Sequence, residues 1–327
     1  MGCVSNGRRH ARSDRPSRHS VVDQACRAGR VHRRDRIQAG RLGEDRRQLD
    51  CPALQEDVAA VDGPSRGGLW SRVAVVTGGG SGLGRAVAKA MARQGAIIVV
   101  ADFDTPRMDR TVSEILKLGT SESAIALSTD VRSDSSVRSL VRDSIKAMGR
   151  VDILVNAAGV LLQGKLELIS TKDWSWMLDT NLLGAVRTST AFLPHMTERG
   201  SGHIVNAVSY GGLAPADPMT VPYDTGYAAL ATFTQALARQ GKDKGVTVSL
   251  FCPGSHSPRI GQNTRSRGMG RWLSNGVGVD DGARMFDQLA GSLIDGLHHP
   301  RFLIVGDPAE AAALHARWAD PTIGPPK

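Results

Sequence analysis

An apolar run of strand length that enters a cluster of glycines constrains this chain more than any other feature. Residues 73–84 read VAVVTGGGSGLG, and apolar residues at helical spacing begin directly after them. Glycine suits such a turn because it adopts positive φ and because the missing Cβ lets backbone N–H groups approach an anion closely. The order strand, glycine turn, helix therefore predicts a phosphate-binding loop, although a glycine cluster by itself also fits a flexible turn.

The alternation of strand and helix continues along the chain. The predicted strands after 73–76 are 97–100, 124–127, 151–155, 203–208, 246–251 and 301–305. Long helical segments are predicted at about 174–198 and 226–237. Seven strands joined by helices predict an α/β fold, a Rossmann-type doubly wound parallel sheet with right-handed crossovers and helices on both faces. Such sheets bind ligands at the carboxyl ends of the strands, where the strand order reverses.

Residues 1–69 differ in composition from the rest. They hold 14 Arg, no Lys, no aromatic residue and nine acids, and so carry +5 of the formal charge of +9. Residues 70–327 carry the other +4 of the formal charge, which is ordinary for an enzyme and argues against nucleic-acid binding by this part of the chain. Only the Arg-rich arm, residues 1–69, would then bind nucleic acid. We expect this arm to be disordered, or to be an extension that is not translated, because it lacks residues to fill a core. Residues 70–320 then form one domain, and 321–327 a short tail.

Targeting and metal-binding patterns are missing from the sequence. No apolar run has the length of a signal sequence or a membrane span, so we expect a cytoplasmic protein with no membrane partner. The four cysteines lie at 3, 26, 51 and 252, and this spacing matches neither a zinc site nor a disulfide framework. We therefore expect reduced thiols and no metal.

Four motifs, taken in their order along the chain, resemble those of the short-chain dehydrogenase/reductase family. The glycine turn with the preceding threonine is similar to TGxxxGxG, and residues 156–159 read NAAG after the fourth predicted strand. The later motifs are IVNAVS, which ends at Ser209, and a Pro-Gly pair at 253–254. The resemblance covers residues 69–320 and implies a single-domain oxidoreductase that binds a nicotinamide dinucleotide.

The resemblance also implies a set of cofactor contacts. In the family the small residues of NAAG leave room for the nicotinamide, the Pro-Gly turn lies beside it, and an Asp after the third strand contacts the adenine. Asp130 takes that last place by position alone and could equally be a turn residue. The residues implied are Thr77, Gly78, Ser81, Gly82, Leu83, Gly84, Asp130, Val131, Asn156, Ala157, Ala158, Gly159, Tyr227, Pro253 and Gly254.

Asp102 ends the second predicted strand, 18 residues beyond Gly84. This is close to the separation of about 20 residues expected for a carboxylate on the adenosine ribose hydroxyls. A carboxylate there predicts NAD(H) in preference to NADP(H), because it would repel a 2′-phosphate and no Arg directly follows it. The alternative is that Asp102 merely sits in a turn before a helix capped by Asp104 or Thr105.

Three residues take catalytic places by resemblance. Ser209 matches the catalytic serine, and Tyr223, 14 residues later, matches the tyrosine that donates or accepts a proton during hydride transfer. Asn181 matches an Asn that helps to hold a water in the proton relay, although an Asn inside a helix also fits a structural hydrogen bond.

The family pattern breaks at residue 227. The family places a Lys four residues after its tyrosine, on the same helix face, where the ammonium stabilises the phenolate and contacts the nicotinamide ribose. Here Tyr227 stands in that place, and its hydroxyl supplies no positive charge. The loss of a charge-assisted interaction of roughly 1.5–3 kcal/mol would slow the reaction about ten- to a hundredfold.

Two functions remain open at this stage. The first is an NAD(H)-dependent oxidoreductase, slowed by the missing Lys, that acts on an alcohol or ketone with Tyr223 as general acid/base. The second is a catalytically impaired relative that binds NAD(H) as a partner subunit or sensor. The substrate pocket is expected at 160–170, 210–220 with Tyr210, and a lid at 255–279. The resemblance also implies a homo-oligomer, a dimer or tetramer, built from the helices around 174–198 and 224–240.

Overall fold

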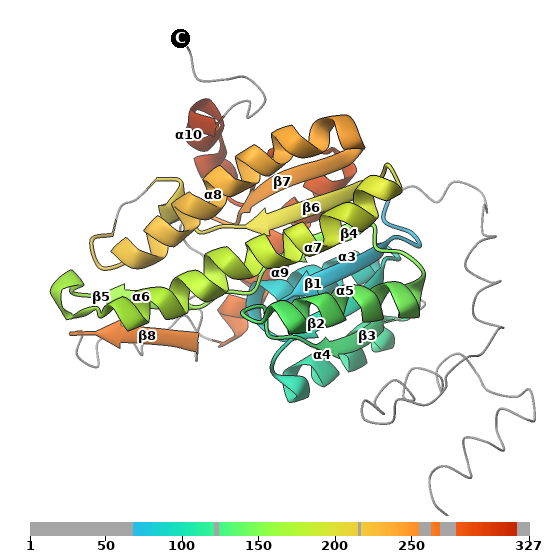
Figure 1. Cartoon of the computed structure of the whole chain (residues 1–327), viewed down its shortest axis with the longest axis horizontal. Helices are drawn as coiled ribbons and strands as arrows, with labels where there is room; N and C mark the ends of the chain where they lie inside the picture. The colour runs from blue at the N-terminus through green and yellow to red at the C-terminus, as the bar shows by residue number, and fades with distance from the viewer. Residues whose placement is uncertain (1–67, 121–123, 215–216, 255–262, 269–278, 319–327) are drawn as a thin grey trace, which may run out of the picture. The chain divides into compact units, whose positions relative to one another are not determined.

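A seven-stranded parallel sheet forms the centre of the protein in the computed structural model, which describes residues 68–120, 124–214, 217–254, 263–268 and 279–318 (Figure 1). The strand order is β3-β2-β1-β4-β6-β7-β9, so the order reverses between β1 and β4. The predicted Rossmann-type sheet is confirmed. The strands are β1 (Val73–Thr77), β2 (Ile97–Asp102), β3 (Ala124–Ser128), β4 (Ile153–Asn156), β6 (Gly202–Ala207), β7 (Val246–Cys252) and β9 (Leu303–Val305).

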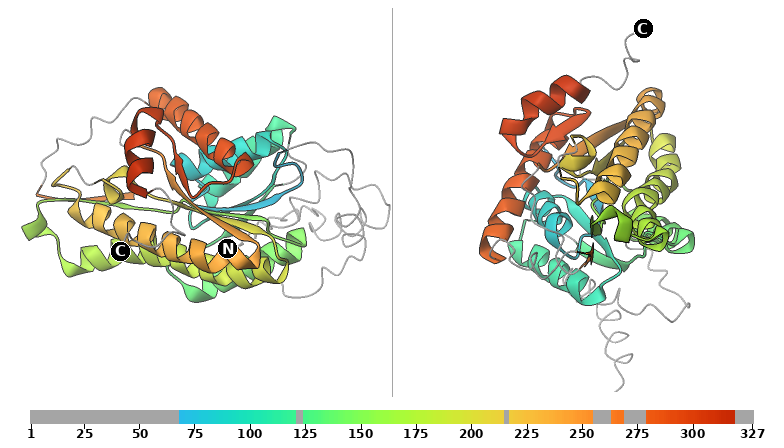
Figure 2. Two further views of the ribbon diagram at one scale, coloured as in Figure 1. Left: turned by 90° about the horizontal axis from the view of Figure 1, so that it is seen from above. Right: turned by 90° about the vertical axis from the view of Figure 1, so that its left-hand side faces the viewer.

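Helices cover both faces of this sheet, as the two views of Figure 2 show. One face carries α3 (Gly82–Arg93), α4 (Thr105–Leu118) and α9 (Val279–His298). The other carries α5 (Asp134–Met148), α7 (Gly184–Glu198) and α8 (Val221–Gly241). The helix α10 (Pro308–Trp318) follows β9 and was not predicted.

The two faces are built from alternate residues of the same strands. Val73 and Val75 of β1 pack with the helices α5, α7 and α8, whereas Ala74 and Val76 pack with α3, α4 and α9. All four side chains are at most 1% exposed. A strand buried on both faces must be apolar throughout, which is why β1 reads as a continuous apolar run in the sequence.

A small second sheet lies beyond the carboxyl ends of the main strands. It pairs β5 (Leu161–Gly164) with β8 (Thr264–Arg267) in parallel, and in Figure 1 both extend to the left of the main sheet beside α6 (Thr171–Leu178). Neither strand was predicted. The structure thus differs from the expected lid at 255–279, since its described segment 263–268 contains a paired strand. Residues 255–262 and 269–278 of the expected lid lie outside the described residues, as do residues 1–67 of the predicted arm and the whole predicted tail, 321–327.

The predicted long helix over 174–198 is interrupted. A π-helical turn, Asp179–Leu183, joins α6 to α7 and contains Asn181. Such turns are rare and are found mostly at functional sites. The helix predicted at 226–237 begins five residues earlier, so that α8 carries both Tyr223 and Tyr227.

Buried polar groups anchor the amino-terminal ends of the strands. The Asp152 carboxylate accepts a hydrogen bond of 2.8 Å from the Val73 amide and pairs with Arg150 and Arg199. In β6, the His203 ring lies 2.8 Å from the Ser249 hydroxyl. Burial lowers the pKa of His203 to about 4, so the ring is neutral at physiological pH.

Candidate active site

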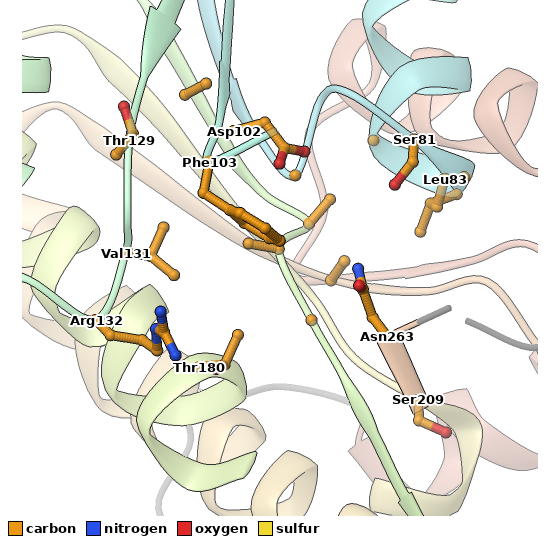
Figure 3. Close-up of a pocket in the computed structure, with 18 of the residues that line it drawn as sticks. Ser81, Leu83, Asp102, Phe103, Thr129, Val131, Arg132, Thr180, Ser209 and Asn263 are labelled. Carbon is orange, nitrogen blue, oxygen red and sulfur yellow. The ribbon is translucent and has the colours of Figure 1, made fainter. Parts of the chain in front are cut away.

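A cavity of about 520 Å³ opens at the carboxyl ends of β1, β2, β3, β4 and β6 (Figure 3). This is the edge where the strand order reverses, as the fold predicts for a ligand site. The structure brings most of the expected site residues together here. The expected residues that line the cavity are Gly78, Ser81, Gly82, Leu83, Gly84, Asp102, Asp130, Val131, Ala157, Ala158, Gly159, Ser209, Tyr223, Tyr227 and Pro253.

The glycine turn packs directly against the loop after β4. Gly78 has a φ of +66°, and a Cβ on it would lie 2.7 Å from Cα of Ala158. The Thr77 hydroxyl accepts hydrogen bonds from the amides of Ala157 and Ala158, at 3.2 and 3.3 Å. A Cβ on Gly84 would lie 2.4 Å from the Gly78 carbonyl oxygen. Positive φ and close backbone contacts therefore both require glycine in this turn.

The carboxylate of Asp102 faces the same turn. It accepts a 3.0 Å hydrogen bond from the Gly80 amide and one of 3.1 Å from the Asp104 amide. Asp104 caps α4 by accepting from the amide of Arg107. The capping role proposed as an alternative thus belongs to Asp104, and Asp102 lines the cavity.

Three further side chains surround this end of the cavity, and sequence reasoning did not identify them. Phe103 is 62% exposed and extends from the end of β2 into the cavity (Figure 3). Arg107 also lines it and pairs with Asp104 at 3.0 Å. Arg132 forms two hydrogen bonds with Asp130, and these lower the pKa of that carboxyl. Phe103 could have been suggested from the sequence, because it directly follows Asp102. Arg107 and Arg132 could not, because only the fold brings their side chains to the cavity.

Two of the expected site residues have structural contacts behind the cavity. Asn156 is 4% exposed and donates hydrogen bonds to Asn206 and Ser189 at 2.8 and 3.0 Å. The Asn181 amide is bound at both ends by the main chain of Val160, donating to its carbonyl and accepting from its N–H at 2.8 Å each. The side chain of Asn181 thus makes the structural hydrogen bonds that were the alternative to a role in the proton relay.

Tyr223 and Tyr227 form an aromatic pair on α8. Their ring centroids lie 4.8 Å apart with an interplanar angle of 81°. A Cβ on Gly159 would lie 2.7 Å from the Tyr227 hydroxyl oxygen, so that glycine leaves space for the second ring. Tyr227 is 7% exposed. It therefore fills the volume between α8 and the loop after β4.

The surroundings of the two phenols disfavour ionisation. Burial raises the pKa of Tyr223 well above 10, the charge and the hydrogen bond of Tyr227 raise it further, and a hydrogen bond with Ser209 lowers it. Burial also raises the pKa of Tyr227, to about 12. None of the main contributions to either pKa comes from a cationic side chain of the described residues. The phenol of Tyr223 is thus neutral near pH 7.

The remaining wall of the cavity comes from segments far apart in the sequence. Trp176 and Thr180 of α6 and the π-turn, Asn263 beside β8, and Phe286 of α9 all line it. Pro253 lines it too, whereas Gly254 packs against Asp307 and Glu310. Tyr210 is not among the lining residues and packs instead with the apolar cluster around Leu230.

The cavity fits a dinucleotide. The glycine turn leaves no room for a Cβ, Ser81 begins a helix whose N-terminus attracts negative charge, and Asp102 offers its carboxylate at the end of β2. Among the described residues there is no cluster of His, Cys, Asp or Glu side chains that could hold a metal ion. None of the described helices is long and apolar enough to cross a membrane.

Comparison with known families matches residues 72–268 to the family described as short chain dehydrogenase. The chain belongs to the short-chain dehydrogenase family. This short-chain dehydrogenase is 35% identical over 192 residues to the (2S)-[(R)-hydroxy(phenyl)methyl]succinyl-CoA dehydrogenase subunit BbsD of Thauera aromatica, a match that covers 58% of this chain and 76% of that protein. An uncharacterized oxidoreductase of Staphylococcus aureus is 33% identical over 186 residues, which are 57% of this chain and 78% of the relative. Membership places this chain among the oxidoreductases.

Solved structures of short-chain dehydrogenases are also similar to the structure of this chain. A short chain dehydrogenase/reductase from Burkholderia phymatum in complex with NAD has a TM-score of 0.64 and 26% identity, covering 79% of this chain and 99% of that one. An actinorhodin polyketide ketoreductase with NADPH has a TM-score of 0.54 and 32% identity over 56% of this chain and 69% of that one. Structural relatives thus bind either nicotinamide dinucleotide.

Proposed function

We propose that this protein is an NAD(H)-dependent oxidoreductase that interconverts an alcohol and a ketone, with Tyr223 as the general acid/base. The observation that carries the proposal is the position of the Tyr223 phenol, which lines the dinucleotide cavity together with Ser209. A nicotinamide dinucleotide, when bound, supplies or accepts the hydride. Tyr223 donates its proton to the carbonyl oxygen in the reduction and takes it back in the oxidation.

Ser209 supports this proton transfer, whereas Tyr227 opposes the loss of the proton. The Ser209 hydroxyl accepts from the Gly211 amide at 3.3 Å and hydrogen-bonds Tyr223, which lowers the pKa of the phenol. The hydrogen bond of Tyr227, by contrast, raises the pKa of Tyr223. Neither hydroxyl carries a positive charge, so we expect a slower enzyme than one with an ammonium at position 227.

The preference for NAD(H) over NADP(H) rests on Asp102. Its carboxylate lies 3.0 Å from the Gly80 amide, within the cavity and at the end of β2. A negative charge at this place attracts ribose hydroxyls and repels a 2′-phosphate.

A second function is favoured by one observation. Tyr227 takes the place of a lysine, and none of the main contributions to the pKa of Tyr223 comes from a cation of the described residues. If that loss abolishes turnover, the protein is an NAD(H)-binding partner subunit or sensor. The match to a protein named as a dehydrogenase subunit is compatible with this alternative.

We further propose that the chain forms a homo-oligomer, a dimer or tetramer, through α7 and α8. The outward side chains of these helices are uncharged over most of their length, unlike an ordinary solvent face. The exposed residues along them include Thr190, Pro194, Thr225, Ala229, Thr232 and Ala236. Size measurement in solution would test this part of the proposal.

Turnover separates the two functions. We would follow NADH oxidation with a panel of small ketones for the native chain, Tyr223→Phe and Tyr210→Phe. Tyr210 is the matched control because it follows Ser209 but does not line the cavity. Activity that only Tyr223→Phe abolishes would support the oxidoreductase. Binding of NADH without turnover in any of the three proteins would leave the non-catalytic function.

A further inference from the structure

We propose that Asp173 is a positioning residue that ties the strand β8 to α6 and so holds one wall of the substrate pocket, formed by Trp176 and Asn263. This inference deepens the proposed function and rests on it for the identity of the pocket. Asp173 lies in the first turn of α6 and is 4% exposed. Its partners come from a segment about 90 residues further along the chain.

The first contacts that hold β8 in place are those of the two-stranded sheet. Leu161 to Gly164 pair in register with Thr264 to Arg267, and the Lys165 amide donates to the Arg267 carbonyl at 3.1 Å. Gln163 also donates to the Ser266 hydroxyl at 3.1 Å. A two-stranded sheet by itself is only marginally stable in water. Side-chain contacts are therefore needed to keep β8 in place.

Asp173 supplies these contacts. Arg267 donates two hydrogen bonds to the carboxylate, of 2.7 and 3.1 Å, in the bidentate arrangement that gives arginine–carboxylate pairs their directional specificity. Arg265 donates a third, at 3.3 Å. The Ser170 hydroxyl donates a fourth, at 2.8 Å. The hydrogen bonds from Arg267 and then from Ser170 lower the pKa of Asp173 to about 2, so the carboxylate is charged at any physiological pH.

Two residues beside the Asp173–Arg267 pair, Trp176 and Asn263, line the cavity. The guanidinium carbon of Arg265 lies 3.8 Å from the ring centroid of Trp176, a cation–π contact, and Trp176 lines the cavity. Asn263 precedes Arg265 by two residues and lines the cavity as well (Figure 3). Alternate residues of a strand point to the same side, so Arg265 and Arg267 of β8 share the side that faces Asp173 of α6.

A single carboxylate thus links two elements of the wall. Trp176 comes from α6, three residues after Asp173, and Asn263 comes from the chain that enters β8. Ser209, in the loop after β6, and Tyr223 of α8 line the same cavity. If the Asp173–Arg267 pair is broken, the substrate loses a fixed wall while the reacting groups keep their places. The expected result is a higher KM for the ketone with little change in kcat.

The test uses the full chain and two substitutions that break the pair from opposite sides. Asp173→Asn removes the charge, and Arg267→Gln removes the bidentate donor without touching the N-terminus of α6. Asp295→Asn is the matched control, since Asp295 also pairs with two side chains, Arg301 and His299, but does not line the cavity. Hydrogen exchange at residues 264–267 is measured first, and it needs no catalytic activity.

We expect exchange at 264–267 to speed up about tenfold in Asp173→Asn and in Arg267→Gln, and not in Asp295→Asn. The KM for the ketone should rise about tenfold in the same two variants, with kcat within about threefold and NADH affinity unchanged. The double variant should be no worse than Asp173→Asn alone, because that substitution already removes the pair with Arg267. Unchanged exchange in Arg267→Gln, or faster exchange with an unaltered KM, would overturn the proposal. If the native chain turns over no ketone, the proposed function fails, whereas the exchange result still decides whether Asp173 holds β8.

Discussion

The substitution Tyr227→Lys tests the catalytic reasoning most directly. In the native chain the pKa of Tyr223 lies well above 10, because the phenol is buried and its neighbours are Tyr227 and Asp224 rather than a cation. Tyr223 is therefore protonated throughout the range from about pH 6 to 9. Ketone reduction, which uses the protonated phenol, should be independent of pH there. Alcohol oxidation, which uses the phenolate, should rise about tenfold for each pH unit.

The size of the change follows from the geometry of the helix. A lysine at position 227 lies on the same face of α8 as Tyr223, four residues away. An ammonium about 4 Å from a phenolate, at an effective dielectric constant of about 20, contributes roughly 4 kcal/mol. Because 1.36 kcal/mol corresponds to about one unit, the pKa of Tyr223 should fall by about three units. The phenolate population at pH 8 would then rise up to about a thousandfold, and the gain in rate is smaller because a weaker base accepts a proton less readily.

The assay is the pH dependence of kcat/KM in both directions, with native chain, Tyr227→Lys and Tyr227→Phe. Tyr227→Phe is the matched control, because it keeps the ring beside Gly159 and removes only the hydroxyl. We expect a pKa of Tyr223 somewhat below that of the native chain but no plateau like that of Tyr227→Lys, because the change removes a contact that raises the pKa and adds no positive charge. A native oxidation profile that levels off below about pH 9, or an unchanged profile in Tyr227→Lys, would refute the reasoning.

Two further predictions concern the cofactor and stability. Asp102→Ser should raise the affinity for NADPH about tenfold relative to NADH, because it removes the charge that repels a 2′-phosphate; fluorescence titration with both nucleotides measures this, and an unchanged ratio would exclude Asp102 as the ribose ligand. The pKa of His203, about 4 in the fold, lies below its ordinary value of 6.5, so the unfolded chain binds more protons between these values. Stability should be constant above about pH 6.5 and fall by up to about 3 kcal/mol towards pH 4. Urea unfolding of the native chain and of His203→Gln would show this, and equal pH slopes would contradict it.

The fold class could be predicted because its signals are local. Val73 to Val76 form an apolar run that only a strand buried on both faces tolerates, and the following glycines permit the positive φ found at Gly78 and Gly82. Strand boundaries were less certain: the fourth strand was expected from residue 151 and begins at Ile153. At that end Val151 and Asp152 are equally buried, so hydrophobicity alone does not mark where pairing starts.

The residues of the candidate site also fall into two groups: those that the sequence could identify and those that it could not. Ser81, Asp102 and Tyr223 could be named from the sequence, since each follows or ends a recognisable element. Trp176, Asn263 and Phe286 could not, because they line the cavity only after α6, β8 and α9 have been brought to one end of the sheet. Their side chains carry no reactive group and lie in no motif.

The sequence by itself determined the parallel sheet, the place of the dinucleotide cavity and the loss of the lysine, all of which depend on residues close together in the chain. The tertiary structure alone decided three other features. It engaged the Asn181 amide with the main chain of Val160, placed the Tyr227 hydroxyl beside Gly159, and joined Asp173 to Arg267. These contacts span between 21 and 94 residues of sequence. Pairings at such separations leave no local pattern, because the packing of whole elements, rather than the residues beside them, selects the partners.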